Sequence, residues 1–427
     1  MAQDSTSDRQ RIAFLPDSAF TVDSVIISGN EHTEARVILR EMTLKHGTRI
    51  TAEAVQFDQS RIYGAGLFTE VEIFAEPKSA DRANIVVKVR ERWYLIPFPV
   101  LGIKDGDWNK AYYGLGLIHD NFRGRNEKVY IVGVLGYDPW GSLSYRNPFL
   151  DSMGAFYYEG RIGYNIVRNR SAAVLLKPTD AFDERHFSIA SSVGKRLDNY
   201  NTVSVSAQYG VVDITDYSPF PTVSNNGIDR FFTFGVGYSY DTRDLGEYPS
   251  AGTFGRAEVL KYGFPGKELD NIRYSLDLRE YVPLSERFVF ASRISTNLLA
   301  GSRAPSYNHV YLGYDYRVRG HYRDVHEGEN ILGLSSELHY SLVPPVYIRV
   351  NFLPSAFGVW RFGAVFALFA DAGAVWFRNN PVGIDSFVRG YGAGIHFLLP
   401  YSFVLRTEYA LNELRTGQVI FDLGSAF

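Results

Sequence analysis

The alternation of apolar and polar residues over the last three quarters of this sequence most constrains its fold. Within residues 402–411, for example, Leu405 and Tyr409 alternate with Arg406 and Glu408. A period of two is typical of a β-strand with one apolar and one polar face. No run approaches the roughly 18 uninterrupted apolar residues that a transmembrane helix needs. Together with 15% aromatic residues and 39 glycines, this pattern indicates a membrane β-barrel, which is apolar toward lipid at every second residue only.

Sixteen alternating segments can be counted, an even number, as a closed antiparallel barrel requires. Turns at one end are tight, as at Phe122–Arg125, whereas longer excursions occur near 169–181, 215–228 and 302–330. Short periplasmic turns and long outer loops are the expected asymmetry of such barrels. The predicted strands are 95–105, 111–122, 127–138, 140–150, 153–168, 182–197, 201–214, 229–242, 251–263, 271–284, 287–301, 331–342, 362–377, 387–399, 402–411 and 417–427.

Residues 344–360 depart from this scheme. The segment is long and apolar, with Ile348 and Phe352, although it falls on the side of the short turns. It either extends the neighbouring strands or lies along the membrane surface, and the sequence leaves both alternatives open.

Composition narrows the function classes. By composition alone, a soluble all-β protein fits as well as a membrane barrel. The formal net charge is −3, so there is no global electrostatic case for binding nucleic acid. The chain has no cysteine, which excludes disulfides, thiolate metal sites and thiol nucleophiles and suits an oxidising compartment. Residues 1–18 are polar and predict a flexible arm; without a visible signal peptide, they resemble a mature N-terminus with an added Met.

Residues 19–92 predict a small α+β domain in the order β-α-α-β-β, ahead of the barrel at 93–427. Thr33 and Thr51 each precede an apolar periodic stretch and are expected to cap a helix. The predicted elements are strands 22–28, 69–76 and 84–91 and helices 33–43 and 51–63.

This domain resembles a POTRA (polypeptide-transport-associated) module. Its markers are Val25-Ile26-Ile27-Ser28-Gly29-Asn30, then Gly66-Leu67-Phe68-Thr69-Glu70-Val71, and finally Val87-Lys88-Val89-Arg90-Glu91. The resemblance implies capture of extended peptides by a periplasmic domain. An open strand edge can pair with a client irrespective of its sequence, although such a domain could equally be a spacer.

The barrel is similar to the BamA-type superfamily of outer-membrane insertases and translocases. Val318-Arg319-Gly320-His321, in the long segment 302–330, resembles the Val-Arg-Gly-aromatic tip of that family's sixth outer loop. His321 stands where the family has Tyr or Phe. The resemblance implies that this loop folds into the lumen of the barrel.

A second motif supplies the expected partner of the loop. Phe369-Ala370-Asp371-Ala372-Gly373 is similar to the family's Phe-x-Asp-x-Gly on the thirteenth strand, which implies an ion pair between Arg319 and Asp371. An Arg in a narrow wet lumen must be paired or hydrated, and a bidentate carboxylate fixes it better than it would fix Lys. Glu337 is a further candidate lumen carboxylate. The alternative for an isolated Arg-Gly is a surface turn.

Three shorter matches complete the comparison. Val388-Arg389-Gly390-Tyr391 resembles the loop motif by letters but lies inside an alternating strand, so we assign it to the barrel wall. Tyr240-Asp241-Thr242-Arg243-Asp244, followed by Tyr248, resembles the family's periplasmic turn after the eighth strand. The last strand carries the features of a C-terminal assembly signal of outer-membrane barrels, with outward Phe421 and Leu423 and the terminal Phe427.

Catalytic motifs are missing from the sequence. It has no Gly-x-Ser-x-Gly, His-Glu-x-x-His or P-loop, and its nine histidines are scattered. We therefore expect no enzyme, no metal and no cofactor. The resemblance implies an outer-membrane protein that inserts or translocates client polypeptides, opening between its first and last strands, with lipid and possible periplasmic proteins as partners. A passive channel and a lipid-handling barrel of the same superfamily are the alternatives.

Overall fold

The computed structural model describes residues 20–104, 108–151, 155–169, 171, 173–174, 182–216, 221–265, 267–322, 324–349, 359–399 and 403–424. The predicted arm at 1–18 and the terminal Phe427 lie outside these ranges. Contacts divide the chain into two compact units, one around the N-terminal domain and one around the large sheet. Among the described residues, no helix is both long and apolar enough to cross a membrane.

The N-terminal domain has the predicted β-α-α-β-β order. Its sheet has the order β1-β3-β2, with β1 parallel and β2 antiparallel to the central β3. The apolar faces of the helices and of β3 are buried, as at Ile38, Ile62 and Ile85. The elements are β1 (Thr21–Ser28), α1 (Ala35–Glu41), α2 (Ala52–Gly64), β2 (Phe68–Pro77) and β3 (Arg82–Glu91).

The two helix caps differ. Thr51 caps α2 as predicted, because its hydroxyl accepts a hydrogen bond from the N–H of Ala54 at 3.1 Å. The prediction for Thr33 was wrong, because Glu34 is the N-cap of α1 and makes no side-chain cap bond. The Thr33 hydroxyl is instead committed to the Glu91 carboxylate at 2.5 Å.

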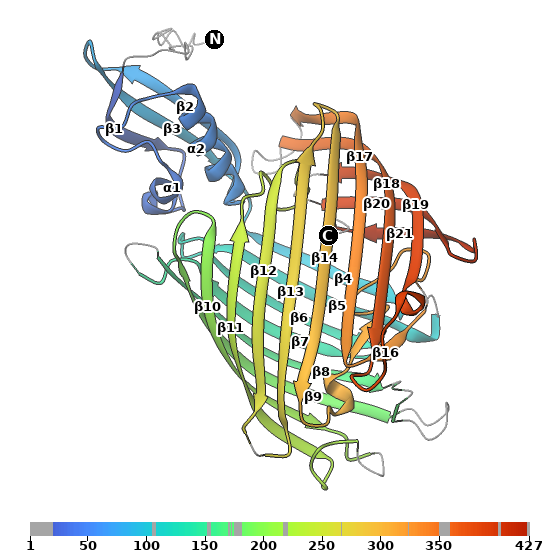
Figure 1. Cartoon of the computed structure of the whole chain (residues 1–427). Helices are drawn as coiled ribbons and strands as arrows, with labels where there is room; N and C mark the ends of the chain where they lie inside the picture. The colour runs from blue at the N-terminus through green and yellow to red at the C-terminus, as the bar shows by residue number, and fades with distance from the viewer. Residues whose placement is uncertain are drawn as a thin grey trace. The chain divides into compact units, whose positions relative to one another are not determined.

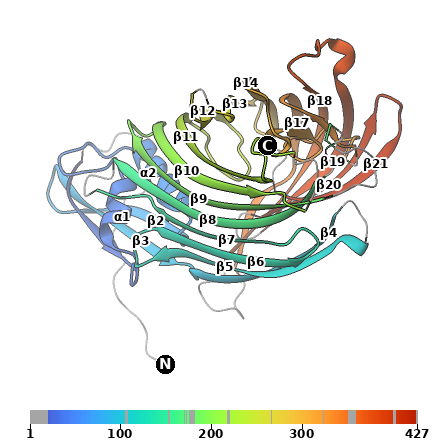
Figure 2. The same cartoon turned by 90° about the horizontal axis from the view of Figure 1, so that it is seen from below.

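The barrel sheet has sixteen strands, as predicted, in the order β21-β20-β19-β18-β17-β14-β13-β12-β11-β10-β9-β8-β7-β6-β5-β4 (Figure 1). The strand pairs whose register the described residues define are antiparallel, and the sheet curves strongly (Figure 2). The strands are β4 (Leu95–Ile103), β5 (Ala111–Phe122), β6 (Glu127–Gly136), β7 (Trp140–Asn147), β8 (Phe156–Asn169), β9 (Phe182–Arg196), β10 (Asn201–Asp213), β11 (Ile228–Asp241), β12 (Gly252–Gly263), β13 (Asp270–Pro283), β14 (Phe288–Gly301), β17 (Asn330–Arg349), β18 (Val359–Trp376), β19 (Val388–Leu399), β20 (Phe403–Asn412) and β21 (Gly417–Leu423).

The two faces of the sheet follow the alternation in the sequence. On β20, Arg406 and Glu408 are 7% and 1% exposed, whereas Phe403 and Tyr409 are 58% and 53% exposed. The polar set therefore faces the concave interior and the apolar set faces outward, toward lipid.

The apolar segment 344–360 extends its neighbouring strands where it is described. β17 continues to Arg349, and β18 begins at Val359. Residues 350–358 lie outside the described part of the chain.

Candidate functional site

The long segment between β14 and β17 folds onto the inner face of the sheet. It contains a short 3-10 helix, η3 (Ser306–Asn308), and a hairpin of β15 (Val310–Leu312) and β16 (His326–Gly328). Val318 is 1% exposed and packs in a cluster with Ile331 of β17. The described part of this segment is thus a packed loop, which we call the lumen loop.

Hydrogen bonds also fix the base of the lumen loop. Ser306 donates to Glu184 of β9 at 3.0 Å, and the Tyr307 hydroxyl donates to Asp229 of β11 at 2.7 Å. After the hairpin, Glu329 forms an ion pair with Arg378, with 2.8 Å between its carboxylate oxygen and the guanidinium nitrogen. The loop therefore has anchors on both sides of its tip.

At the tip, Arg319 lies against Asp371 of β18. Its Nε donates to Oδ2 and its Nη2 donates to Oδ1, both at 2.6 Å, and the Arg319 N–H also donates to Oδ2 at 3.1 Å. Both side chains are buried. The structure thus brings together the two charged residues that the motifs paired.

Other groups surround the same guanidinium. Its Nη1 donates to Glu337 of β17 and, at 3.0 Å, to Glu408 of β20, while Nη2 also donates to Ser335 at 3.1 Å. The guanidinium carbon lies 3.7 Å from the centre of the Phe369 ring, a cation–π contact. Arg319 therefore connects the lumen loop to three strands of the barrel.

Glycines allow the backbone of the loop to approach the wall. Gly320 has φ +97°, a conformation that favours glycine. A Cβ atom on Gly390 would lie 1.6 Å from the carbonyl oxygen of Arg319, and one on Gly373 would lie 2.9 Å from the Val318 side chain. Gly390 belongs to β19, as predicted for its Val-Arg-Gly-Tyr stretch. The backbone of the loop tip packs directly against this position of the wall.

His321 makes polar contacts in place of the aromatic packing expected in the family. Its Nδ1 lies 2.8 Å from Asp324 and its Nε2 lies 2.6 Å from Glu413. Only the imidazolium can donate from both nitrogens. Although burial of the ring disfavours its charge, the hydrogen bonds with Glu413 and Asp324 raise the pKa of His321 above its ordinary value.

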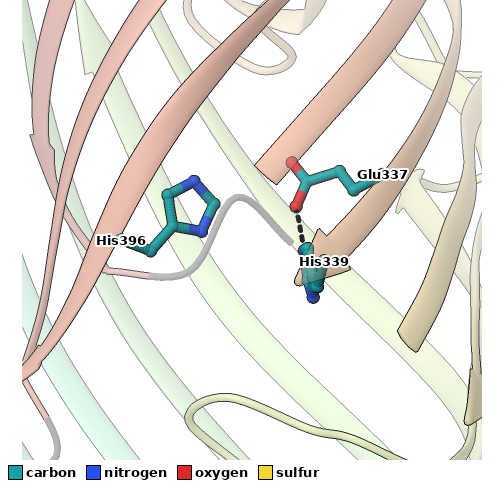
Figure 3. Close-up of side chains that lie close together, drawn as sticks. All are labelled: Glu337, His339 and His396. Atoms are coloured by element: carbon teal, nitrogen blue, oxygen red, sulfur yellow. Dashed lines mark hydrogen bonds and ion pairs between the residues drawn. The ribbon is translucent and has the colours of Figure 1, made fainter. Parts of the chain in front are cut away.

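The ion pairs continue along the inner face. Arg406 bonds Glu408 at 3.1 Å and Asp422 at 2.7 Å. His339 lies 2.6 Å from Glu337, and His396 lies 3.2 Å from Glu408 (Figure 3 shows both rings beside Glu337). We call this connected set the lumen cluster: Arg319, Ser335, Glu337, His339, Asp371, His396, Arg406, Glu408, Asp422 and Tyr248.

Tyr248 reaches the lumen cluster from the turn between β11 and β12. Its hydroxyl lies 2.9 Å from His396 Nδ1, and its ring stacks on His339 with centroids 5.2 Å apart. In the same turn, Arg243 is paired with Asp241 at 2.8 Å. This turn was identified only by its resemblance, and the structure adds the contact to the cluster.

The sequence motifs did not identify seven members of the lumen cluster as parts of the site: Ser335, His339, His396, Arg406, Glu408, Asp422 and Tyr248. The inward register was the available signal for the six that lie on strands. Ser335 and His339 share the face of Glu337 on β17, and Glu408 lies on the polar face of β20. The resemblance assigned Tyr248 to a turn, but nothing local in the sequence predicts its contacts with His339 and His396.

The last strand exposes apolar side chains on the outer face of the sheet. Phe421 and Leu423 are 71% and 67% exposed on β21. Both lie on the lipid-facing side, while Phe427 lies outside the described residues.

Chemically, this arrangement holds a loop in place. A cavity of about 310 Å³ adjoins the cluster and is lined by charged and aromatic side chains, including Arg293, Tyr322 and Asp422. Guanidinium groups, carboxylates and phenols surround it, and Arg319 of the loop and Ser335, Asp371 and Glu408 of the barrel wall all line it.

Comparison with known proteins agrees with this architecture. Residues 121–427 match the Omp85 superfamily domain, and residues 20–92 match a POTRA family described as surface antigen variable number repeat. The fold is similar to BamA from Haemophilus ducreyi lacking POTRA domains 1–3, at 17% identity and a TM-score of 0.57, over 95% of this chain and 84% of that one.

The fold is also similar to CdiB from Escherichia coli, at 12% identity and a TM-score of 0.61. That match covers 95% of this chain and 76% of the CdiB chain. CdiB from Acinetobacter baumannii matches at 13% identity and a TM-score of 0.55, over 95% and 72% of the two chains. The chain therefore belongs to the Omp85 superfamily, as an outer-membrane β-barrel protein whose single identified POTRA domain lies in the periplasm.

Proposed function

We propose that this protein inserts client polypeptides into the outer membrane or passes them across it. The observation that carries the proposal is the lumen loop, locked by Arg319 to β17, β18 and β20. Membership of the Omp85 superfamily and the likeness to BamA and CdiB support it. The clients are extended or unfolded polypeptides.

The POTRA domain supplies the capture edge in this proposal. β1 is already covered in part, because its start bonds to the backbone of residues 47–50. In the described sheet, β2 is the opposite edge strand and has β3 as its neighbour. An extended client can add to β2 as a further strand through main-chain hydrogen bonds.

The exit lies at the seam between β4 and β21, the two ends of the sheet order. Pro97 and Pro99 remove two backbone donors from β4. Gly417 begins β21, and Gly424, directly after this strand, has φ +112°. A seam with few donors and flexible ends can open at low cost and offer its edges to a client β-strand.

The lumen loop argues against the passive channel. A sixteen-strand barrel can leave an aqueous pore unless something fills it. Here the tip residues Val318 and Arg319 are 1% and 5% exposed and are packed against the wall. We therefore propose a plugged barrel, with transport at the seam.

Disulfide locking in the native host tests the seam. The chain has no native cysteine, so cysteine pairs introduced in β4 and β21 form the sole disulfide, favoured by the oxidising periplasm. The matched control is a disulfide between cysteines at Tyr274 of β13 and Leu298 of β14, two paired positions whose strands stay together in the proposed mechanism. We expect the seam lock to deplete specific proteins from the outer membrane or the medium, with recovery on reduction. Unchanged protein content relative to the control would contradict the proposal, and altered lipid content alone would favour lipid handling.

Planar-bilayer conductance tests the plug. The parent is expected to conduct weakly, and Arg319→Ala and Asp371→Ala are expected to raise conductance or its fluctuation. Arg146→Ala, which removes an exposed ion pair with Glu159, is the control and should behave as the parent. A large, steady conductance of the parent that the substitutions do not change would make the passive channel the better account.

A further inference from the structure

We propose that Glu337, His339 and His396 form a binding site for one divalent transition-metal ion, of which Zn²⁺ is the representative. Their donor atoms lie within 4.8 Å of one another, and all three residues are buried. The inference concerns the lumen cluster itself and stands apart from the handling of clients.

The donor set has the right chemistry. Two imidazoles and one carboxylate form a common zinc-binding set, with a fourth position left for water or another ligand. Imidazole nitrogen also suits copper, nickel and iron, so the class is the first-row transition metals rather than Mg²⁺ or Ca²⁺. In Figure 3 His396 lies on one side and Glu337 and His339 lie on the other, with the Glu337 carboxylate directed toward the side of His396.

The geometry needs only side-chain rotation. Glu337 and His339 lie two residues apart on β17 and face the same side, with Oε2 and Nε2 2.6 Å apart. The ring of His396 on β19 has its centroid 5.9 Å from that of His339. Donors bound to one zinc at about 2.0–2.1 Å lie roughly 3.3 Å apart at tetrahedral angles. To bind the ion, the donor atoms of Glu337 and His339 would have to move slightly apart, and both would have to move slightly closer to His396.

The surrounding charge favours a cation. Within the lumen cluster, four carboxylates, those of Glu337, Asp371, Glu408 and Asp422, face two guanidinium groups, those of Arg319 and Arg406. With neutral histidines this leaves a surplus of two negative charges, one of them contributed by the partly exposed Asp422, and one divalent ion would neutralise both. Buried charge that is unpaired is costly.

Neighbouring groups can orient the ligands. The second nitrogen of a metal-bound histidine usually bonds a polar partner that fixes the ring. His396 has such partners on both sides, Tyr248 on Nδ1 and Glu408 on Nε2, so either partner can hold the ring while the other nitrogen binds. The Tyr248 ring also stacks on His339.

The site is linked to the lumen loop through Glu337. One carboxylate oxygen of Glu337 accepts from Arg319, and the other lies against His339. A metal that binds the second oxygen leaves the first on the guanidinium. The ion would therefore brace β17 to β19 across β18 and reinforce the anchor of the loop.

Zinc titration of the full-length protein in detergent tests the site. Chelator-treated protein is equilibrated with ZnCl₂ and desalted, and bound zinc is counted by mass spectrometry. We expect one ion per chain, and His339→Asn and His396→Asn should each weaken binding at least about tenfold. Binding should also weaken on acidification, because protons compete for the imidazoles.

His186→Asn is the matched control. His186 also stands two residues from a carboxylate on one strand, with Nε2 2.9 Å from Glu184, but it is not part of the three-donor set. It should leave zinc binding unchanged. Equal loss in the control and the two site variants would overturn the proposal, as would failure of the parent to bind zinc at micromolar concentrations.

Cobalt provides a test that needs no folded variant. Co²⁺ added to the chelated parent should give a visible absorption band of a nitrogen-ligated, low-coordinate ion, and Zn²⁺ should displace it. A spectrum identical to that of hydrated Co²⁺ would refute the site even if the histidine variants failed to fold.

Discussion

The guanidinium of Arg319 and the carboxylate of Asp371 meet through two parallel hydrogen bonds, both 2.6 Å long. The two residues come from a loop tip and from β18, and both are buried. This fork geometry is specific to arginine, because an ammonium group acts as a point charge. Ser335 adds a bond of 2.6 Å to the same carboxylate.

Arg319→Ala should destabilise the barrel more than Asp371→Ala. Loss of the guanidinium leaves three carboxylates facing one another, whereas without Asp371 the guanidinium keeps Glu337 and Glu408. Breaking a buried pair typically costs about 3–5 kcal/mol, and we expect Arg319→Ala in that range. Thermal unfolding in detergent, followed by circular dichroism, measures the order.

The double variant is the internal control for that prediction. Its destabilisation should be smaller than the sum of the two single effects, because the residues interact directly. Arg319→Lys should recover only part of the loss. Additive effects, or equal stability of Arg319→Lys and the parent, would show that the bidentate contact contributes little.

Gly390→Ala should displace the lumen loop without changing any charge. The new methyl group would lie 1.6 Å from the backbone oxygen of Arg319, which cannot move as a side chain can. Overpacking typically costs about 1–3 kcal/mol. We expect a lower melting temperature and more frequent conductance events in planar bilayers.

Gly133→Ala on β6 is the control for the glycine substitution. A Cβ atom there meets nothing within 4 Å, so stability and conductance should stay close to those of the parent. If Gly390→Ala also behaved as the parent, the loop would not pack as closely against β19 as the structure indicates.

Sequence alone predicted the strands well because each carries its own periodic pattern. β5 was predicted at 111–122 and observed at Ala111–Phe122. β17 was predicted at 331–342, with 344–360 left open as an extension of the neighbouring strands, and it runs to Arg349 through Pro344 and Pro345. The pairing of β17 with β14 ends at Tyr340, so these prolines remove no bond in that pairing.

The site was only partly predictable, for a physical reason. Arg319 and Asp371 belong to motifs, whereas Tyr248 and His396 meet only when distant strands close around one lumen. No local spacing encodes that approach. The polar contacts of His321 could not be predicted either, because its partner Glu413 comes from the turn after β20, far away in the sequence.

Loop stability should depend on pH through His321. Its pKa in the folded protein is raised, by its bonds with Glu413 and Asp324 against the opposing effect of burial. A raised pKa means that the stabilisation is fully present below the unfolded pKa of about 6.5 and is lost as pH rises through the folded pKa. Because both carboxylates are about half exposed, we expect about 1 kcal/mol or less.

Comparison of the parent with His321→Asn over pH 5–9 measures this contribution. The difference in melting temperature should be largest at acidic pH and should shrink as pH rises. His326→Asn, at an exposed position of the same loop, is the control and should give a flat difference. A difference for His321→Asn that grows with pH would contradict the imidazolium assignment.

Asp58→Ala should unfold the POTRA domain selectively. The Asp58 carboxylate on α2 is fully buried, and it accepts hydrogen bonds from the Thr43 N–H and hydroxyl, both at 2.7 Å, and from the Leu44 N–H at 2.9 Å. Its removal leaves two backbone donors unpaired in a small core, at a cost of roughly 2–3 kcal/mol or more. Limited proteolysis should then cleave residues 20–92 while the barrel keeps its resistance to heat and protease.

Asp81→Ala, which removes an exposed carboxylate near Ser79, is the control and should leave the POTRA domain resistant to the protease. Equal resistance of Asp58→Ala would mean that the connection between α1 and α2 holds without this carboxylate.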